Sequence, residues 1–354
     1  MKILDRYLAR QVIANTLLVL LVLTAISSLI TFVGEFNKVG QSHYTLGAAL
    51  RYTLLYVPAQ ASAMFPVAVL LGAMLGLGEL ASHNELMVLR TSGTSVVRIG
   101  LSAMLGGLIL VVLCVALGEF VAPPAERNAE DQRSLLLYNQ ANVLGAGGVW
   151  AKDGNLFVNV KKIGKLDTAQ NIYLFKFDGA HRLLSATQAG SAMFQDGHWV
   201  LRNLHETQLS AEGAVTRDTA SATWKTLLAP SLLNLFVVDT DSLSARGLYH
   251  YINYLKANSI NTDRYVAAFW GKVAQPVAVL LMMLLALPFV FGPMRSSSTG
   301  QRLLVGMLVG IGFYVFNSIF IQTGVVFGLD PVFTAWLPTA VLAIVSGVAV
   351  SRIR

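Results

Sequence analysis

Six long apolar stretches, separated by polar segments, dominate the hydrophobic pattern of the chain. A membrane-crossing helix needs roughly 20 mostly apolar residues, because about 30 Å of hydrocarbon is spanned at about 1.5 Å per residue. The stretches run from about Val12 to Phe36, Leu50 to Leu77, Ile99 to Val121, Tyr265 to Phe291, Leu303 to Val326 and Val332 to Val350. We therefore expect six spanning helices, three before and three after a long polar interval.

The first stretch follows Lys2, Arg6 and Arg10, as the apolar core of a secretory signal peptide would. Such a core is about 7–15 residues long and precedes a small-x-small cleavage site. This stretch is longer and ends in the segment from Phe32 to Phe36, which offers no such site. We expect it to be a retained membrane helix.

The basic residues of the short loops fall mostly on one side of the expected spans. That side holds Lys2, Arg6, Arg10, Arg90, Arg98, Arg295, Arg302, Arg352 and Arg354. The short loops of the other side hold Lys38 and Arg51. Loops rich in Lys and Arg stay in the cytoplasm. We therefore expect both termini in the cytoplasm and the polar interval outside it.

The polar interval, from about Pro123 to Asn261, has the pattern of a separate domain. Pro123 and Pro124 are expected to break the third spanning helix, and a polar, possible helix follows up to Asn139. From Val149 onward the apolar residues alternate with polar ones, which is typical of strands. The expected strands and turns include Leu156–Val160, Ile172–Phe177, Trp199–Leu201 and Ala222–Trp224, with Asp178-Gly179 and Asp196-Gly197 as hairpin turns.

Several short strands at this spacing predict a sandwich or a roll, and an amphipathic helix from Ser244 to Ala257 leads back to the membrane. The predicted fold is a membrane α-helical protein with an inserted, extracytoplasmic, β-jellyroll-like all-β domain. The expected divisions are residues 1–122 with three spans, 123–262 with the β domain, and 263–354 with the last three spans.

Composition agrees with a membrane protein. Of 354 residues, 55% are hydrophobic and 13% are charged, whereas a soluble domain is about 45–50% apolar and about 25% charged. The net charge of +7 fits the loop asymmetry, and without basic residues interleaved with aromatics we expect no nucleic-acid binding. The single Cys114 excludes a disulfide framework. P-loop, G-x-S-x-G and H-E-x-x-H motifs are absent and the histidines are scattered, so we expect no catalysis, metal or cofactor.

The cytoplasmic segment from Glu79 to Gly93 predicts a short helix between spans two and three. Ser82 and Glu85 have capping-box spacing, and Gly93 stands where a helix ends. Because a loop between spans needs no such helix, we expect this helix to dock onto another protein. For Glu85, a capping role and a docking role both stay open. The docking candidates are Glu85, Leu86, Met87, Leu89 and Arg90.

A second set of candidates surrounds a possible cavity between the spans. Charges inside a membrane indicate function by default, although these lie near an interface, where long side chains reach water. Aromatic rings can line an apolar cavity or pack in the core. The candidates are Glu35, Lys38, Met64, Phe65, Phe313, Phe316 and Phe320, with Lys272 and Gln275 also near the interface. Gly72-x-x-x-Gly76 and Gly306-x-x-x-Gly310 predict close helix contacts, within the chain or with a partner subunit.

Several segments together make the whole chain resemble the LptF/LptG permeases of the lipopolysaccharide export system. They are Leu4–Tyr7, Leu70–Gly93, Gly118–Pro123, Val149–Gly154, Thr223–Thr226, Leu248–Lys256 and Gly292–Ser296. The resemblance implies a non-catalytic permease in the inner membrane of a Gram-negative cell. It implies a heterodimer with an LptF-like permease, driven by two copies of an LptB-like ATPase, with a helix from LptC.

The same resemblance implies a path for the lipid. Lipopolysaccharide would enter between span one of one permease and span five of the other, and leave through the β-jellyroll domains toward the LptA bridge. Glu85 matches the acidic position that contacts the ATPase. Relatives can carry a basic residue in the last turns of span one, where this chain has Thr31 and Phe32. Lys38 is the candidate for that phosphate-facing role.

The sequence leaves three other functions open. Other ABC permeases, which release lipoproteins or export macrolides, place their large soluble domain after the first span, whereas here it follows the third. A membrane enzyme acting on lipid-linked sugars would need clustered carboxylates or histidines at the interface. A structural assembly protein without transport would differ by not co-purifying with an ATPase.

Overall fold

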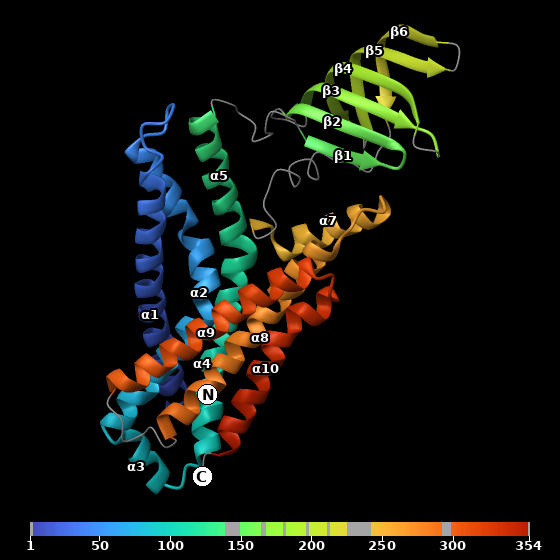
Figure 1. The fold of residues 1–354 in the computed structure, drawn as a ribbon. Helices are drawn as coiled ribbons and strands as arrows, with labels where there is room; N and C mark the ends of the chain where they lie inside the picture. The colour runs from blue at the N-terminus through green and yellow to red at the C-terminus, as the bar shows by residue number, and fades with distance from the viewer. Residues whose placement is uncertain are drawn as a thin grey trace.

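The computed structural model describes residues 3–138, 149–163, 168–179, 182–195, 198–210, 213–224, 242–291 and 299–352. Six helices in this part of the chain are long and apolar enough to cross a membrane, which confirms the predicted spans. Five of them are α1 (Ile3–Phe36), α2 (Leu46–Ser82), α8 (Asp263–Phe291), α9 (Thr299–Val326) and α10 (Pro331–Ser351), and the sixth begins as α4 (Val96–Ala116). Figure 1 shows them as one bundle, with both termini at the end opposite the β-sheet.

Most spans begin earlier than the apolar pattern predicts, because polar residues cap the helices outside the apolar run. The hydroxyl of Thr45 accepts a hydrogen bond from the backbone N–H of Ala48 at the start of α2. Ser95 does the same for α4. Asp330 accepts from two backbone N–H groups at the start of α10, where Pro331 fills the first turn. Such caps satisfy donors that have no partner inside the helix.

The third span does not break at Pro123 and Pro124, which corrects the sequence-based expectation. A π-helical turn, η1 (Leu117–Val121), joins α4 directly to α5 (Ala122–Tyr138), and the backbone N–H of Ala122 donates to the carbonyl of Leu117. Proline clashes with the carbonyl four residues earlier, and the wider turn just before the prolines moves those carbonyls aside. The expected domain boundary at residue 122 therefore lies within a continuous helix.

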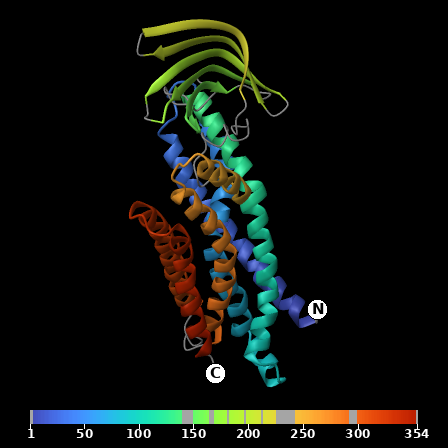
Figure 2. The ribbon, with the colours of Figure 1, turned by 90° about the vertical axis from the view of Figure 1, so that its right-hand side faces the viewer.

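The inserted domain is an antiparallel sheet, as predicted. Within the described residues, six strands pair in chain order in one sheet, and Figure 2 shows this sheet strongly curved. They are β1 (Val149–Asp153), β2 (Leu156–Ile163), β3 (Thr168–Phe177), β4 (Leu183–Gln195), β5 (His198–Ser210) and β6 (Gly213–Trp224). Asp178 and Gly179 follow β3 at a turn as predicted, whereas Asp196-Gly197 lies outside the described residues.

The amphipathic helix α7 (Ala245–Ala257) covers the sheet and joins it to α8. Tyr254 donates through its hydroxyl to the carbonyl of Lys152 at 2.6 Å, and Asn258 accepts from the N–H of Gly154 at 2.9 Å. Burial raises the pKa of Tyr254 to about 12. The buried faces of α7 and the sheet form one apolar core.

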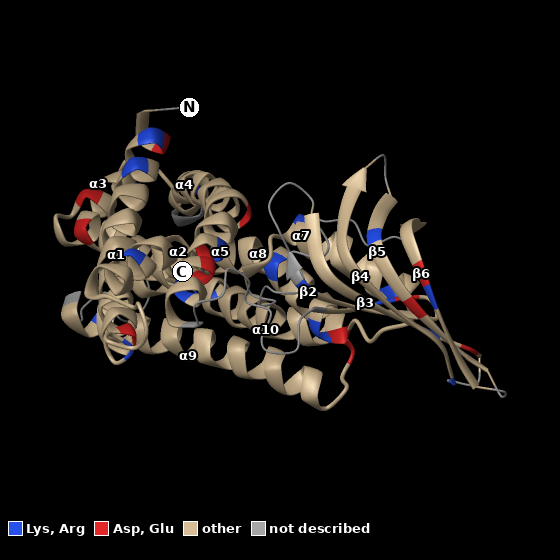
Figure 3. Cartoon of the chain, turned by 90° about the horizontal axis from the view of Figure 1, so that it is seen from above, with Lys and Arg blue, Asp and Glu red and all other residues tan. Residues whose placement is uncertain are grey.

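The helix bundle has its own core around α2, the most buried of the spans. A Cβ atom on Gly72 would lie 2.3 Å from the Cα of Thr16 in α1. A Cβ atom on Gly310 would lie 2.8 Å from Val67. Both predicted glycine motifs therefore mark helix contacts within this chain. Figure 3 shows charged residues at α3, at the start of α1 and on the sheet, with α9 and α10 almost free of them.

Candidate functional site

A cavity of about 910 Å³ lies between the spans. Its wall is formed by residues of α1, α2, the π turn η1, the start of α5, α8, α9 and α10. The lining mixes small and apolar side chains with amides, hydroxyls and the charged side chains of Glu126, Arg264 and Lys272. A cavity of this size and mixed lining accepts an amphiphilic ligand better than a purely polar solute.

Of the seven predicted cavity residues, two line this space and five do not. Met64 and Phe313 face it. Phe65 is 0% exposed and belongs to the bundle core. Phe316 is 42% exposed on the outside of α9 and packs against Phe320 with the ring centroids 5.7 Å apart.

Helix geometry explains why some rings of α9 line the cavity and others do not. Each residue along an α-helix rotates the side-chain direction by about 100°. The α9 positions that line the cavity are Phe313, Tyr314, Asn317, Ser318, Ile321, Gln322, Val325 and Val326. This face differs from the one that carries Phe316 and Phe320. Phe316 and Phe320 therefore do not line this cavity of the single chain, and their contact with a lipid stays a prediction.

Sequence reasoning missed the polar contacts that hold α1 to α2 beside the cavity. The side-chain carbonyl of Gln60 accepts a hydrogen bond from the Ser28 hydroxyl at 2.8 Å. Its amide donates to the Thr31 hydroxyl at 2.7 Å. Gln60 is buried and lines the cavity together with Thr31. An isolated glutamine in an apolar run is the signal that could have found it.

Glu35 and Lys38 lie at the C-terminal end of α1 and contact each other rather than standing apart. The Lys38 ammonium lies 2.6 Å from a Glu35 oxygen. The other Glu35 oxygen accepts from the Tyr44 hydroxyl at 2.9 Å and lies 3.4 Å from Arg133 of α5. Burial raises the pKa of Tyr44, and its hydrogen bond to Glu35 raises that pKa further.

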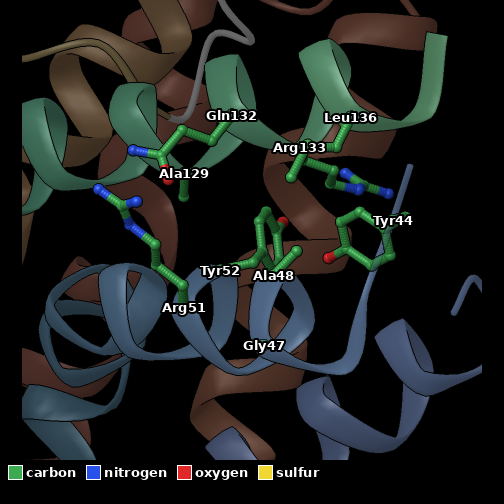
Figure 4. Close-up of a pocket in the computed structure, with 9 residues that line it drawn as sticks. All are labelled: Tyr44, Gly47, Ala48, Arg51, Tyr52, Ala129, Gln132, Arg133 and Leu136. Atoms are coloured by element: carbon green, nitrogen blue, oxygen red, sulfur yellow. The ribbon is translucent and has the colours of Figure 1, made fainter. Parts of the chain in front are cut away.

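A smaller cavity of about 300 Å³ adjoins this cluster, between the start of α2 and α5. In Figure 4, Arg51 and Tyr52 of α2 face Gln132 and Arg133 of α5 across it. The Arg133 guanidinium stacks 5.1 Å from the centre of the Tyr52 ring. The continuous α5 places these groups here, so a broken helix would have left the outer cluster incomplete.

The predicted short helix between spans two and three is α3 (Glu85–Thr91), but its start differs from the prediction. Its N-cap is Asn84, in a left-handed conformation and without a side-chain cap bond. The Ser82 hydroxyl bonds back to the carbonyl of Glu79 in α2, so no capping box forms. Glu85 instead accepts a hydrogen bond from the hydroxyl of Tyr7 in α1 at 2.8 Å.

The end of α3 is as predicted. Gly93 has φ +88°, its N–H donates to the carbonyl of Arg90, and the N–H of Thr94 donates to that of Leu89, which is the Schellman pattern. Of the predicted docking residues, Glu85, Met87 and Arg90 are exposed, Leu89 is half-buried and Leu86 is buried against the bundle. Leu86 therefore anchors the helix, and Val88, which the sequence reasoning omitted, is exposed.

Comparison with known proteins decides the family. The family described as "Lipopolysaccharide export system permease LptF/LptG" matches residues 6–352. This chain belongs to the LptF/LptG family. It is similar to the lipopolysaccharide export system permease protein LptG of Escherichia coli strain K12, with 38% identity over 347 residues, 97% of this chain and 96% of that protein.

A second relative agrees with this assignment. LptG of Haemophilus influenzae strain Rd is 36% identical over 353 residues, which cover 99% of both chains. The LptF/LptG architecture of six membrane helices with an inserted sheet domain is the one described above.

Proposed function

We propose that this chain is the permease subunit that takes lipopolysaccharide out of the inner membrane for delivery toward the outer membrane. The observation that carries the proposal is the cavity of about 910 Å³ walled by the spans of an LptF/LptG-family chain. Its similarity to proteins named as lipopolysaccharide export permeases supports this cargo.

The lining of the cavity suits the chemistry of such a lipid. Met64, Val67 and Phe313 offer apolar surface to acyl chains. Arg264 and Lys272 offer cationic groups to phosphates. The neighbouring Lys38 keeps three donors on its ammonium, one of which meets Glu35. Lys38 therefore stays a proposed phosphate contact, now held in place by Glu35.

The proposed partners follow from the exposed surfaces of the bundle. Outward-facing apolar residues are abundant on α1 and α9, for example Leu21, Ile30 and Leu308, as a lipid- or helix-contacting face would be. We assign one such face to an LptF-like permease and expect a helix of LptC beside the pair. The exposed face of α3 is assigned to an LptB-like ATPase, which supplies ATP hydrolysis, and the sheet domain to the path toward LptA.

The proposed orientation places α3 and both termini in the cytoplasm and the sheet in the periplasm. The basic loops support it, and both termini lie at the end of the bundle where α3 is found (Figure 1).

Site-specific photocrosslinking tests the cargo and the cavity together. Photoreactive residues replace Tyr314 and Asn317, which line the cavity, and Phe316, a matched control on the outer face of the same helix. We expect crosslinks to lipopolysaccharide at Tyr314 and Asn317 that ATP diminishes, with a weaker and ATP-independent signal at Phe316. An equal signal at all three positions would contradict a cavity-bound cargo.

A further inference from the structure

The cytoplasmic helix α3 is bonded to α1 by a side-chain contact that the backbone does not require. The Tyr7 hydroxyl donates to a Glu85 oxygen at 2.8 Å. One turn further along α1, Gln11 donates to a Glu79 oxygen at the end of α2, at 2.7 Å. Tyr7 is 45% exposed and Glu85 is exposed, so core packing does not impose the contact.

The contact ties α3 to α1, to which it is not adjacent in the chain. α3 has seven residues, lacks a side-chain cap bond at its start and is anchored through Leu86. Only two residues separate α3 from the end of α2, so a displacement of α3 is transmitted to α2 through the backbone. The same displacement is transmitted to α1 through the hydrogen bond between Tyr7 and Glu85.

The two routes differ in stiffness. α2 contains Pro58 and Pro66 in its interior, and prolines interrupt the hydrogen-bond ladder of a helix and allow it to bend. α1 runs for 34 residues from Ile3 to Phe36 without a proline. α1 therefore joins Tyr7 to the cavity wall at Thr31 and to Glu35 through one uninterrupted helix.

We propose that Tyr7 is a positioning residue that transmits movement of α3 to α1 and thereby to the cavity wall. This inference rests on the proposed function, in which an ATPase acts on α3. A carboxylate has two oxygens that accept hydrogen bonds, so Glu85 can hold Tyr7 with one while the other meets a donor on the ATPase.

The test uses the complete complex of this chain with its partner permease and ATPase in lipid nanodiscs, loaded with lipopolysaccharide. Tyr7→Phe removes the hydroxyl and keeps the ring. We expect association with the ATPase and the rate of ATP hydrolysis to stay within about twofold of the unmodified complex. Lipid released per ATP should fall by about tenfold or more, the scale expected for one hydrogen bond to a charged group.

Two further variants separate this role from docking. Glu85→Gln keeps an acceptor for Tyr7 but removes the charge, so it should weaken ATPase association while Tyr7→Phe does not. Tyr249→Phe, an exposed tyrosine of α7, is the matched control and should leave every readout unchanged. Combining Tyr7→Phe with Glu85→Ala should add no further loss of coupling beyond that of Glu85→Ala alone.

A distance measurement decides the role of Tyr7 whatever the cargo is. Spin labels at the exposed Val88 of α3 and Leu18 of α1 should keep one separation with and without ATP, because the helices move together. In Tyr7→Phe the separation should change with ATP. An ATP-independent separation in Tyr7→Phe, or a wild-type release ratio, would overturn the inference and leave the proposed function standing, whereas failure of the unmodified complex to release lipid would contradict the proposed function.

Discussion

Single polar side chains fasten the apolar helices of this bundle at defined points. Asp5, near the start of α1, is 5% exposed. It accepts a hydrogen bond from the Ser102 hydroxyl at 2.6 Å and forms an ion pair with Arg98 of α4 at 2.9 Å. Removing one partner of a buried pair leaves the other uncompensated. Here the half-exposed Arg98 can turn toward water, so losing the ion pair lowers the stability less than it would for a fully buried pair.

We expect Asp5→Asn to lower the stability of the bundle by about 1 kcal/mol, because the amide keeps a bond to Ser102 but loses the ion pair. The melting temperature in detergent should fall by about 2–4 °C. Asp263→Asn is the control, since Asp263 stands in the first turn of another span. An equal fall in both variants would show that any aspartate near a helix start has the same effect.

At the scale of single residues, the sequence indicates which polar side chains lie at the helix ends better than it indicates which groups they contact. The sequence singles out Glu35 and Lys38 at the end of the first span, but the other partners of Glu35 are Tyr44 and Arg133, which come from a loop and from α5. Arg133 reaches Glu35 only because α5 continues past the prolines. A local pattern contains no information about such a long-range contact.

At the scale of elements, glycine decides which helices approach most closely. Gly72 meets Thr16 so tightly that a Cβ atom would lie 2.3 Å from its Cα and 2.6 Å from its backbone nitrogen. Backbone atoms cannot turn away as a side chain can, so α1 and α2 would have to separate. The same spacing in α9 meets flexible side chains of α2 instead.

Gly72→Ala is therefore expected to destabilise the α1–α2 pair by about 1–3 kcal/mol, the usual scale of overpacking. Gly34→Ala is the control, because nothing lies within 4 Å of the Cβ atom it would add. Resistance to thermal aggregation and to proteolysis in detergent measures the difference. Wild-type behaviour of Gly72→Ala would contradict the close contact.

The elements themselves were largely predictable, and the errors have physical causes. Apolar length alone predicts six spans, because lipid requires every backbone group to be bonded within a helix. The break at Pro123 was wrong because a π turn compensates for the prolines. Phe316 lies off the cavity face of α9 because the packing of that helix against α2, α8 and α10 determines its orientation, which a local pattern does not contain.

At the scale of the molecule, the bundle and the sheet domain meet through α7. The Glu119 carboxylate, in the π turn, accepts from the backbone N–H groups of Ala245 and Arg246 at 2.7 and 3.0 Å. A carboxylate at the start of a helix satisfies free donors and meets the positive end of its dipole. α7 in turn packs on the sheet, so the third span and the sheet are attached to the same helix.

Glu119→Ala should loosen that attachment without unfolding either part. We expect amide hydrogen exchange at Ala245 and Arg246 to rise by about fivefold, corresponding to a lost cap of about 1 kcal/mol. Asp330→Ala, which removes the equivalent cap of α10, should raise exchange at Val332 and Phe333 instead. Unchanged exchange at α7 in the Glu119 variant would contradict the attachment.

The π turn also determines how α5 is rotated about its own axis, and therefore in which direction its side chains point. An inserted residue rotates the following helix by about 100° relative to an unbroken α-helix. Ala129, Arg133 and Leu136 face α2 in this phase. Deleting one residue from Leu117–Val121 would swing them about a quarter of a circle away while leaving their sequence intact. A deletion of a single residue there would therefore redirect the whole face of α5 that meets α2, whereas substitutions along α5 would change that face one side chain at a time.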